Sequence, residues 1–311
     1  WKLIDARNEV SKDKNWEDRI IKVLYRPFDN REIFYSDDII ERSRKDIMQH
    51  MMHENIGLIT SKIHRQLSLG YIFITNTIVD FHVLDNARDS TSVFPLYIYE
   101  EKKKKNLQSI MVFEPETEYG KKGKKPNIAP KVFEQLEKAY KKKPTPEQIL
   151  YYCYAILYSN IYREKYAEFL KIDFPRIPFT SDYNSFQQLA KLGEELAELH
   201  LLKHKSLNHP TTKYFGKGDS DKIEKPVYDE DAKRVFINES RYFDNISPEV
   251  WNYQIGGYQP MEKYLKDRKG RQMDDPGHYC KMATALSLTI ELQKEIDKLF
   301  PKAESKVIEI K

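Results

Sequence analysis

The segment Val250-Trp-Asn-Tyr-Gln-Ile-Gly-Gly-Tyr-Gln-Pro-Met-Glu-Lys-Tyr-Leu-Lys-Asp-Arg-Lys-Gly-Arg271 contains both strand and helix signals. Its first part predicts a short strand that ends at Gly256-Gly257. Pro260 then predicts the first turn of a helix, where a missing N–H group costs nothing. Spacings of three and four residues place several apolar side chains on one face of that helix, namely Met261, Tyr264 and Leu265. A strand followed directly by an amphipathic helix favours a mixed fold.

The same segment has two functional interpretations. Two glycines before a helix N-terminus allow close backbone approach and leave N–H groups that suit a phosphate. The basic residues Lys263 and Lys266 lie on another face, and Lys269 and Arg271 follow the helix end. The alternative is an ordinary helix that buries its apolar face and carries charges outside. The spacing alone does not separate the two.

Apolar periodicity on the N-terminal side of this segment continues the mixed pattern. Residues 19–35 predict a bent strand or hairpin interrupted by Pro27, and strand-like runs between residues 56 and 99 predict a small sheet. Further signals predict helices over residues 36–53, 146–170, 184–202 and 277–299, and a hairpin over residues 227–237. The order has no strict βαβ repeat, which excludes a doubly wound nucleotide fold. We predict an α+β fold with small antiparallel or mixed sheets packed with several long helices.

The chain of 311 residues is long enough for two domains or for one large domain with appendages. We divide it into a polar lead-in from an upstream domain (1–20), a sheet-containing half (21–145) and a half of helices and a β-hairpin (146–311). The first half includes a Lys-rich insertion at residues 102–143, with 13 Lys against five Glu. Such a stretch either follows a phosphate backbone or forms a solvated loop.

Composition excludes several classes of protein. Forty per cent of the residues are hydrophobic, which is enough for a core and excludes wholesale disorder. No run of 18 apolar residues predicts a membrane span, and the first residues do not form a signal peptide. Cys153 and Cys280 are too far apart to indicate a zinc knuckle or a disulfide framework. We expect a cytoplasmic protein without membrane partners.

The sequence contains no complete catalytic or metal-binding motif. A DNA amino-methyltransferase needs an Asn/Asp-Pro-Pro-aromatic loop, and no Pro-Pro dipeptide occurs. His200 and His204 share the spacing of zinc ligands on a helix, but the Glu of the metalloprotease motif is replaced by Leu201. We therefore predict no catalytic residue, metal ligand or cofactor site in this chain. An alternative is a Mg²⁺-dependent nuclease that uses Asp229, Asp231 and Lys233, which lie in the predicted hairpin turn.

Several motifs, taken together and in order, resemble a known family. They are Tyr25-Arg-Pro-Phe-Asp-Asn-Arg31, Val93-Phe-Pro-Leu-Tyr97, Tyr162-Arg-Glu-Lys-Tyr166, Phe174-Pro-Arg-Ile-Pro178 and the segment quoted above. Over residues 20–298 the chain is similar to the C-terminal target-recognition, or specificity, region of single-polypeptide type I (type ISP) and type IIG restriction-modification enzymes. The resemblance implies a target-recognition-domain-like fold.

The resemblance also implies a function. Such a region reads a target in double-stranded DNA and positions it for adenine-N6 methylation by an upstream methyltransferase domain of the same polypeptide. The full-length enzyme uses S-adenosylmethionine for methylation and Mg²⁺ for DNA cleavage, whereas this part is expected to be non-catalytic. A further alternative is a protein-interaction scaffold, in which the helices at 147–170 and 277–299 dock on the methyltransferase domain.

Candidate DNA-contacting residues follow from residue type and predicted position. Base edges are read by polar side chains at strand ends and loops, so we predict base contacts by Ser61, Lys62, His64, Arg65, Gln66, Asn76 and Arg88. We predict phosphate contacts by Lys213, Arg241, Lys263, Lys266, Lys269 and Arg271. We assign Arg26, Asp29 and Arg31, in the first family motif, to a domain junction.

Overall fold

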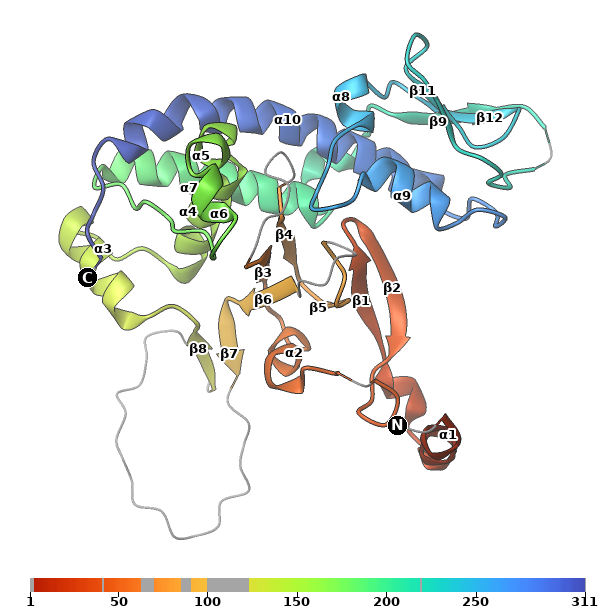
Figure 1. Cartoon of the computed structure of the whole chain (residues 1–311), viewed down its shortest axis with the longest axis horizontal. Helices are drawn as coiled ribbons and strands as arrows, with labels where there is room; N and C mark the ends of the chain where they lie inside the picture. Colours follow the sequence, from red (N-terminus) through yellow and green to blue (C-terminus); the bar gives the residue numbers. More distant parts are fainter. Residues whose placement is uncertain are drawn as a thin grey trace.

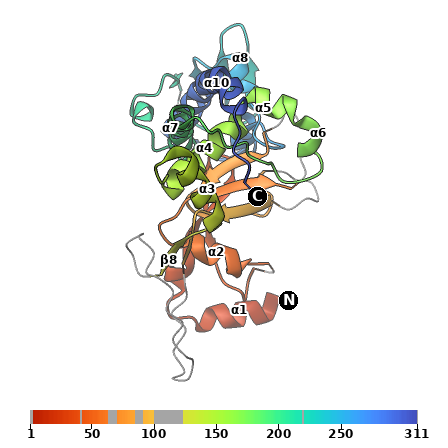
Figure 2. The same ribbon diagram turned by 90° about the vertical axis from the view of Figure 1, so that its left-hand side faces the viewer.

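A computed structural model describes residues 3–40, 42–62, 70–84, 91–99, 123–218 and 220–310. The long helices lie together along one side of the molecule, and most of the small sheets lie beneath them (Figure 1). A view from the side shows the same layers (Figure 2). The helices in the described ranges are α1 (Leu3–Lys12), α2 (Lys45–Met51), α3 (Pro130–Tyr140), α4 (Pro146–Tyr158), α5 (Asn160–Lys165), α6 (Ala167–Leu170), α7 (Tyr183–His200), α8 (Pro248–Trp251), α9 (Pro260–Lys266) and α10 (Pro276–Glu304), with short 3-10 helices η1 (Trp16–Arg19) and η2 (Lys205–Asn208).

The strands form small separate sheets. One sheet has the order β2–β1–β5, in which β1 (Ile20–Arg26) pairs antiparallel with β2 (Asp29–Phe34) and parallel with β5 (Ile78–Val79). The other ladders are antiparallel: β4–β3–β6 (Ile72–Thr75, Gly57–Ser61, Thr91–Pro95), β7–β8 (Tyr97–Tyr99, Lys124–Pro126) and β10–β11–β12–β9 (Val227–Asp229, Arg234–Phe236, Arg241–Asp244, Lys213–Gly216). Small antiparallel and mixed sheets beside long helices confirm the predicted α+β fold.

The helical layer is built on the close packing of α4 and α7. Helix α4 starts with a capping box, in which Thr145 Oγ1 accepts a hydrogen bond from the Gln148 N–H group and the Gln148 side chain accepts one from the Thr145 N–H group. On α7, Gly193 lies directly against the carbonyl oxygen of Tyr151: an added Cβ atom would be 1.8 Å from that oxygen. The two helices therefore approach at a distance that only glycine permits.

The hydrophobic core does not divide at residue 146. One cluster packs Leu24, Phe28 and Phe73 from the sheet-containing half against Leu199 and Tyr279 from the helical half. A second cluster packs Ile72 and Leu96 against residues of α4 and α7. Both clusters bury side chains from either half, so the described residues of the two halves depend on each other for their packing.

Two predicted helices are shorter than their sequence patterns suggested. The helix expected over residues 146–170 is interrupted at Ser159, whose hydroxyl accepts a hydrogen bond from the Tyr162 N–H group and donates one to Asp297 Oδ1 at 2.7 Å. The helix expected over residues 36–53 reduces to α2. Ser36 instead closes a turn, because its hydroxyl accepts from the Asp38 N–H group.

The described part of the Lys-rich stretch contributes to the fold. Residues 123–143 contain β8 and α3, and α3 buries Leu136 and Tyr140. The Tyr140 hydroxyl donates a hydrogen bond to the Thr180 carbonyl at 2.7 Å. The lysines at 102–105, 121 and 122 lie outside the described residues. In the ranges that the structure covers, no helix combines the length and apolar character needed to cross a membrane.

Candidate nucleic-acid interface

The predicted base-contact residues are only partly within the described chain. Ser61 is buried at the end of β3 and Lys62 is exposed just after it, whereas Asn76 is exposed between β4 and β5. Because β3 and β4 run antiparallel, with Thr60 opposite Ile72, Lys62 and Asn76 lie at opposite ends of their sheet. The structure does not bring these two together. The remaining candidates lie outside the described residues: His64, Arg65, Gln66 and Arg88.

The turn from Ile255 to Tyr258 joins two distant parts of the sheet-containing half. The Gly256 N–H group donates to the Gly70 carbonyl at 2.8 Å, and the Gly257 N–H group donates to the Leu84 carbonyl at 2.7 Å. The strand expected to end at Gly256-Gly257 is reduced to isolated bridges at Ile255. Carbonyls occupy the two N–H groups, so of the two interpretations left open for this segment the structure does not support a phosphate site at these glycines.

Helix α9 follows this turn as predicted, starting at Pro260 and burying Met261, Tyr264 and Leu265. Its two lysines are paired along the helix: Lys263 Nζ lies 2.5 Å from Asp267, and Lys266 Nζ lies 2.8 Å from Glu262. After the helix, Lys269 and Arg271 are exposed. Neither makes an ion pair with another residue in the described ranges, so both are available to a phosphate.

The other two phosphate candidates lie on the four-stranded sheet. The Arg241 guanidinium donates to the carbonyls of Gly216 and Gly218, each at 2.9 Å, and its Nε lies 2.9 Å from Asp221. These contacts hold the loop after β9, so Arg241 has a structural role. Lys213 is exposed on β9, opposite Asp244 on β12.

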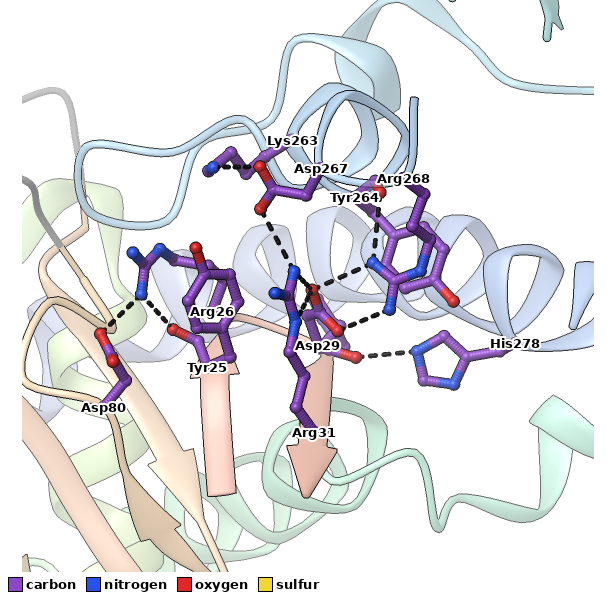
Figure 3. Close-up of polar contacts among 11 residues, drawn as sticks. Tyr25, Arg26, Asp29, Arg31, Asp80, Lys263, Tyr264, Asp267, Arg268 and His278 are labelled. Atoms are coloured by element: carbon purple, nitrogen blue, oxygen red, sulfur yellow. Dashed lines mark hydrogen bonds and ion pairs between the residues drawn. The ribbon is translucent and has the colours of Figure 1, made fainter. Parts of the chain in front are cut away.

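Asp29 connects the β1–β2 hairpin to α9. Its buried carboxylate accepts hydrogen bonds from Arg268 Nη2 at 2.7 Å and Nη1 at 3.0 Å, and from Arg31 Nη2 at 2.9 Å (Figure 3). Burial alone would raise the pKa of Asp29, but the hydrogen bonds from Arg268 and Arg31 outweigh it and hold that pKa below its usual value. The carboxylate is therefore charged and shared between two guanidinium groups.

Further cations extend this network on both sides. Arg26 Nη1 lies 2.7 Å from Asp80, which ties β1 to the chain after β5 (Figure 3). Asp267 lies between Lys263 and Arg31 Nη2, at 3.5 Å from the latter. The Arg31 guanidinium also lies 3.6 Å from the centre of the Tyr25 ring. The structure thus places Arg26, Asp29 and Arg31 where the hairpin meets α9 and β5.

Arg268 belongs to this site but was not predicted as a site residue. It lies just after α9, behind the C-cap residue Asp267, at the helical spacing of Met261, Tyr264 and Leu265 in the sequence. Its guanidinium lies 3.6 Å from the Tyr264 ring centre. An Arg on an otherwise apolar, buried face is the one signal in the sequence, because such a charge needs an acidic partner. The partner, Asp29, was predicted as a junction residue, but it lies 239 positions away and nothing in the sequence indicates the pairing with Arg268.

The alternative nuclease site has the geometry of a turn. Asp229 is the last residue of β10, and its Oδ1 accepts a hydrogen bond from the Ala232 N–H group at 3.0 Å. Lys233, at φ 53°, completes the turn into β11. Among the described residues, no three His, Cys, Asp or Glu side chains gather as a metal site would require. This arrangement gives the nuclease interpretation no support.

His200 and Cys280 are buried groups of the core. The His200 ring is bonded to the Tyr154 hydroxyl at 2.6 Å and to Thr289 Oγ1 at 2.9 Å, and burial lowers its pKa to about 3. His204 instead caps η2 by accepting from the Ser206 N–H group. Burial raises the pKa of Cys280 to about 11. A neutral His and a protonated thiol in these positions are structural.

Comparison with known proteins adds a family and a set of folds. A family model described as the Type ISP C-terminal specificity domain matches residues 1–294. No curated protein matches the chain. One similar solved structure is a nuclease-deletion mutant of the Type ISP restriction-modification enzyme LlaGI with a DNA substrate mimic; it has 19% sequence identity and a TM-score of 0.64, and the match covers 92% of this chain and 25% of that chain. A second is the ATP-dependent Type ISP restriction-modification enzyme LlaBIII bound to DNA, with 20% identity, a TM-score of 0.67 and coverage of 95% of this chain and 20% of that chain. A third is a DrdV–DNA complex, with 20% identity, a TM-score of 0.67 and coverage of 90% of this chain and 28% of that chain. The likeness shows a shared fold, and this chain spans 20–28% of the length of those chains.

Proposed function

This chain belongs to the Type ISP C-terminal specificity domain family, and from that membership we propose that it recognises a sequence in double-stranded DNA for a restriction-modification enzyme. The three structures compared above are complexes with DNA or a DNA mimic, which supports the proposal. An upstream methyltransferase domain of the same polypeptide would methylate adenine N6 with S-adenosylmethionine, and Mg²⁺ would serve cleavage elsewhere in the enzyme. Acting on cellular DNA, the protein would work in the cytoplasm.

The geometry that carries the proposal is the convergence at the Ile255–Tyr258 turn. This turn leads into α9, and hence to Lys269 and Arg271, and it also holds Gly70 and Leu84. Those two residues adjoin, along the chain, the segments that contain the predicted base contacts. Recognition of duplex DNA needs cations that fix the protein on the phosphates and polar groups that reach base edges. The turn therefore links α9, which precedes the predicted phosphate contacts, to the residues that border two predicted base-contact stretches in the sequence.

Replacing Lys269 and Arg271 together with Ala is expected to weaken binding to every duplex sequence alike. Each phosphate contact releases about one counterion from the DNA when the protein binds. Without two such contacts, the slope of the logarithm of the binding constant against the logarithm of the salt concentration should become shallower by about 2. The measurement is fluorescence anisotropy of the 311-residue chain with labelled duplex DNA at several salt concentrations. A control removes the same charge from α10 through Lys294→Ala and Lys298→Ala, whose side chains pair with Glu291 and Glu295. An equal effect in control and test variants would contradict the assignment.

An apolar surface around α6 favours a second, compatible role in packing against the rest of the polypeptide. Phe169 and Ile172 are 64% and 68% exposed and line a cavity of about 540 Å³ with Tyr166 and Pro178. A cluster of exposed apolar side chains favours an interaction site, whereas single exposed ones do not.

Replacing both Phe169 and Ile172 with Asp is expected to leave the DNA affinity of the isolated chain unchanged, because neither residue adjoins Lys269 or Arg271, the predicted phosphate contacts after α9. In the full-length enzyme the same change should separate this domain from its neighbours, since charges would have to be buried there. Limited proteolysis of the full-length enzyme measures the separation: a protease should release this domain faster from the variant than from the wild-type enzyme. An unchanged cleavage rate would exclude packing at this surface.

A further inference from the structure

The backbone at Gly256 has a conformation that only glycine accepts without strain. Its φ angle is +59°, and an added Cβ atom would lie 2.1 Å from the Leu84 carbonyl oxygen. The close approach is what allows the consecutive N–H groups of Gly256 and Gly257 to reach two different carbonyls, those of Gly70 and Leu84. Two residues 14 positions apart in the chain are thus held by adjacent peptide groups.

Gly70 is also supported from the helical layer. An added Cβ atom at Gly70 would lie 2.6–2.7 Å from the guanidinium atoms of Arg163, so the Gly70 backbone packs directly against that guanidinium group. Arg163 is fixed in turn, because its Nε donates to the Leu157 carbonyl at 2.7 Å and its guanidinium lies 4.8 Å from the Tyr158 ring centre. The Tyr158 hydroxyl donates to the Ile72 carbonyl at 3.0 Å. The start of β4 is therefore anchored to α4 and α5.

The chain leading to Leu84 is anchored in a similar way. The Tyr258 hydroxyl donates to the His82 carbonyl at 3.0 Å. Asp80 Oδ1 accepts from the His82 N–H group at 2.9 Å and from Arg26 Nη1 at 2.7 Å. Val83 and Leu84 are fully buried. No described element besides the Ile255–Tyr258 turn donates backbone hydrogen bonds to both Gly70 and Leu84.

We propose that Gly256, Gly257 and Arg163 are positioning residues for target recognition, which fix Gly70 and Leu84 relative to each other, the two described residues that border the predicted base-contact stretches in the sequence. The inference rests on the proposed function. Several predicted base contacts lie outside the described residues, namely His64, Arg65, Gln66 and Arg88. The structure describes the residue that follows the first stretch, Gly70, and the residue that precedes the second, Leu84. Base reading needs side chains held to within about half an ångström, whereas a phosphate contact by a flexible Lys tolerates larger shifts. We call the hydrogen bonds from Gly256 and Gly257 to the Gly70 and Leu84 carbonyls the clamp. Loss of the clamp should therefore reduce the preference for one DNA sequence more than the affinity for DNA in general.

The test is Gly256→Ala in the 311-residue chain, with Gly270→Ala as the matched control. Both glycines have positive φ, +59° and +83°, so both substitutions strain the backbone, but a Cβ atom at Gly270 would meet nothing within 4 Å. The probe is a pool of random-sequence DNA duplexes, from which the wild-type chain selects bound sequences. For each variant, affinity is then measured for the selected duplex and for the unselected pool at several salt concentrations.

For Gly256→Ala we expect the ratio of selected to unselected affinity to fall at least tenfold, with affinity for the pool within twofold of wild type and an unchanged salt slope. Gly270→Ala should retain the wild-type ratio. Tyr258→Phe removes only the hydroxyl that holds His82, keeps the packing, and should lower the ratio by at least threefold if Gly256→Ala fails to fold.

Other outcomes overturn the inference. An unchanged ratio in Gly256→Ala and Tyr258→Phe would show that the clamp does not position the reading residues. An equal loss for selected and unselected DNA would make the clamp a general structural element only. Failure of the proposed function itself has a different signature, because the wild-type chain would then select no sequence and show no salt-dependent affinity. In that case the inference falls with it.

Discussion

Replacing Asp29 with Asn is expected to lower the free energy of unfolding by about 3 kcal/mol, the lower end of the range for breaking a buried ion pair. The carboxylate side chain is 3% exposed, and its loss leaves the guanidinium groups of Arg31 and Arg268 without their charged acceptor. We choose the lower end because the two Arg side chains are 34% and 21% exposed, so water partly solvates them. Urea denaturation at neutral pH measures the change.

The same variant should also change the response to acid. Because the pKa of Asp29 is lowered in the folded state, its ion pairs stabilise the protein above the pKa of the unfolded carboxyl group, about 3.9. That contribution is lost as pH falls from there through the lower pKa of the folded state. Wild type should therefore lose more stability than the Asn variant between about pH 5 and pH 2.

The control for both measurements is Asp37→Asn. Asp37 pairs with Lys45, but its side chain is 59% exposed. Solvent screening limits such a pair to about 0–1 kcal/mol. If Asp29→Asn were no more destabilising than this control, the hairpin would not depend on its ion pairs with α9.

Replacing Gly193 with Ala is expected to destabilise the protein by about 3 kcal/mol, at the upper end of the usual cost of overpacking. In an open helix the same change would stabilise by about 1 kcal/mol, because Ala has the higher helix propensity. Here the new methyl group would lie 1.8 Å from the Tyr151 carbonyl oxygen, and backbone cannot move aside as a side chain does. Thermal unfolding of the variant measures the sign of the effect directly.

Gly277→Ala provides the comparison within a helix. Gly277 lies in the first turn of α10, where an added Cβ atom would be 3.3 Å from Asp275 Oδ1, which caps the helix by accepting from the His278 N–H group. We expect a change within about 0.5 kcal/mol for this surface position. Equal melting temperatures for the two Ala variants would mean that α4 and α7 can separate without cost.

Local signals predicted those parts of the fold that depend on residues close in sequence. Pro260 and the apolar spacing after it gave α9, and Asp182 caps α7 through the Asn184 N–H group. The hairpin predicted over residues 227–237 is present as β10 and β11. Caps and turns lie within a few residues of the elements that they end, so one sequence suffices to find them. The resemblance of several motifs in order is confirmed by the family match over residues 1–294.

Features that depend on distant partners were not predictable in this way. At the break, the Ser159 hydroxyl donates a hydrogen bond to Asp297, which lies 138 positions further along the chain. The peptide groups of Gly256 and Gly257 resemble a free anion site in sequence, and only the fold brings the carbonyls of Gly70 and Leu84 to them. A sequence pattern shows which groups can bond but not which partner occupies them, and for buried polar groups the partner determines the role.

Helix α10 has a practical consequence for where this region can be cut. The family match ends at residue 294, yet the helix continues to Glu304 and buries Ile296, Phe300 and Ala303. Beyond it, the Ile308 N–H group donates to the Phe179 carbonyl at 2.8 Å. A fragment trimmed to the matched region would expose apolar side chains that the intact chain covers and would tend to aggregate. Chimeras that exchange this region between enzymes should therefore place their junction after residue 308.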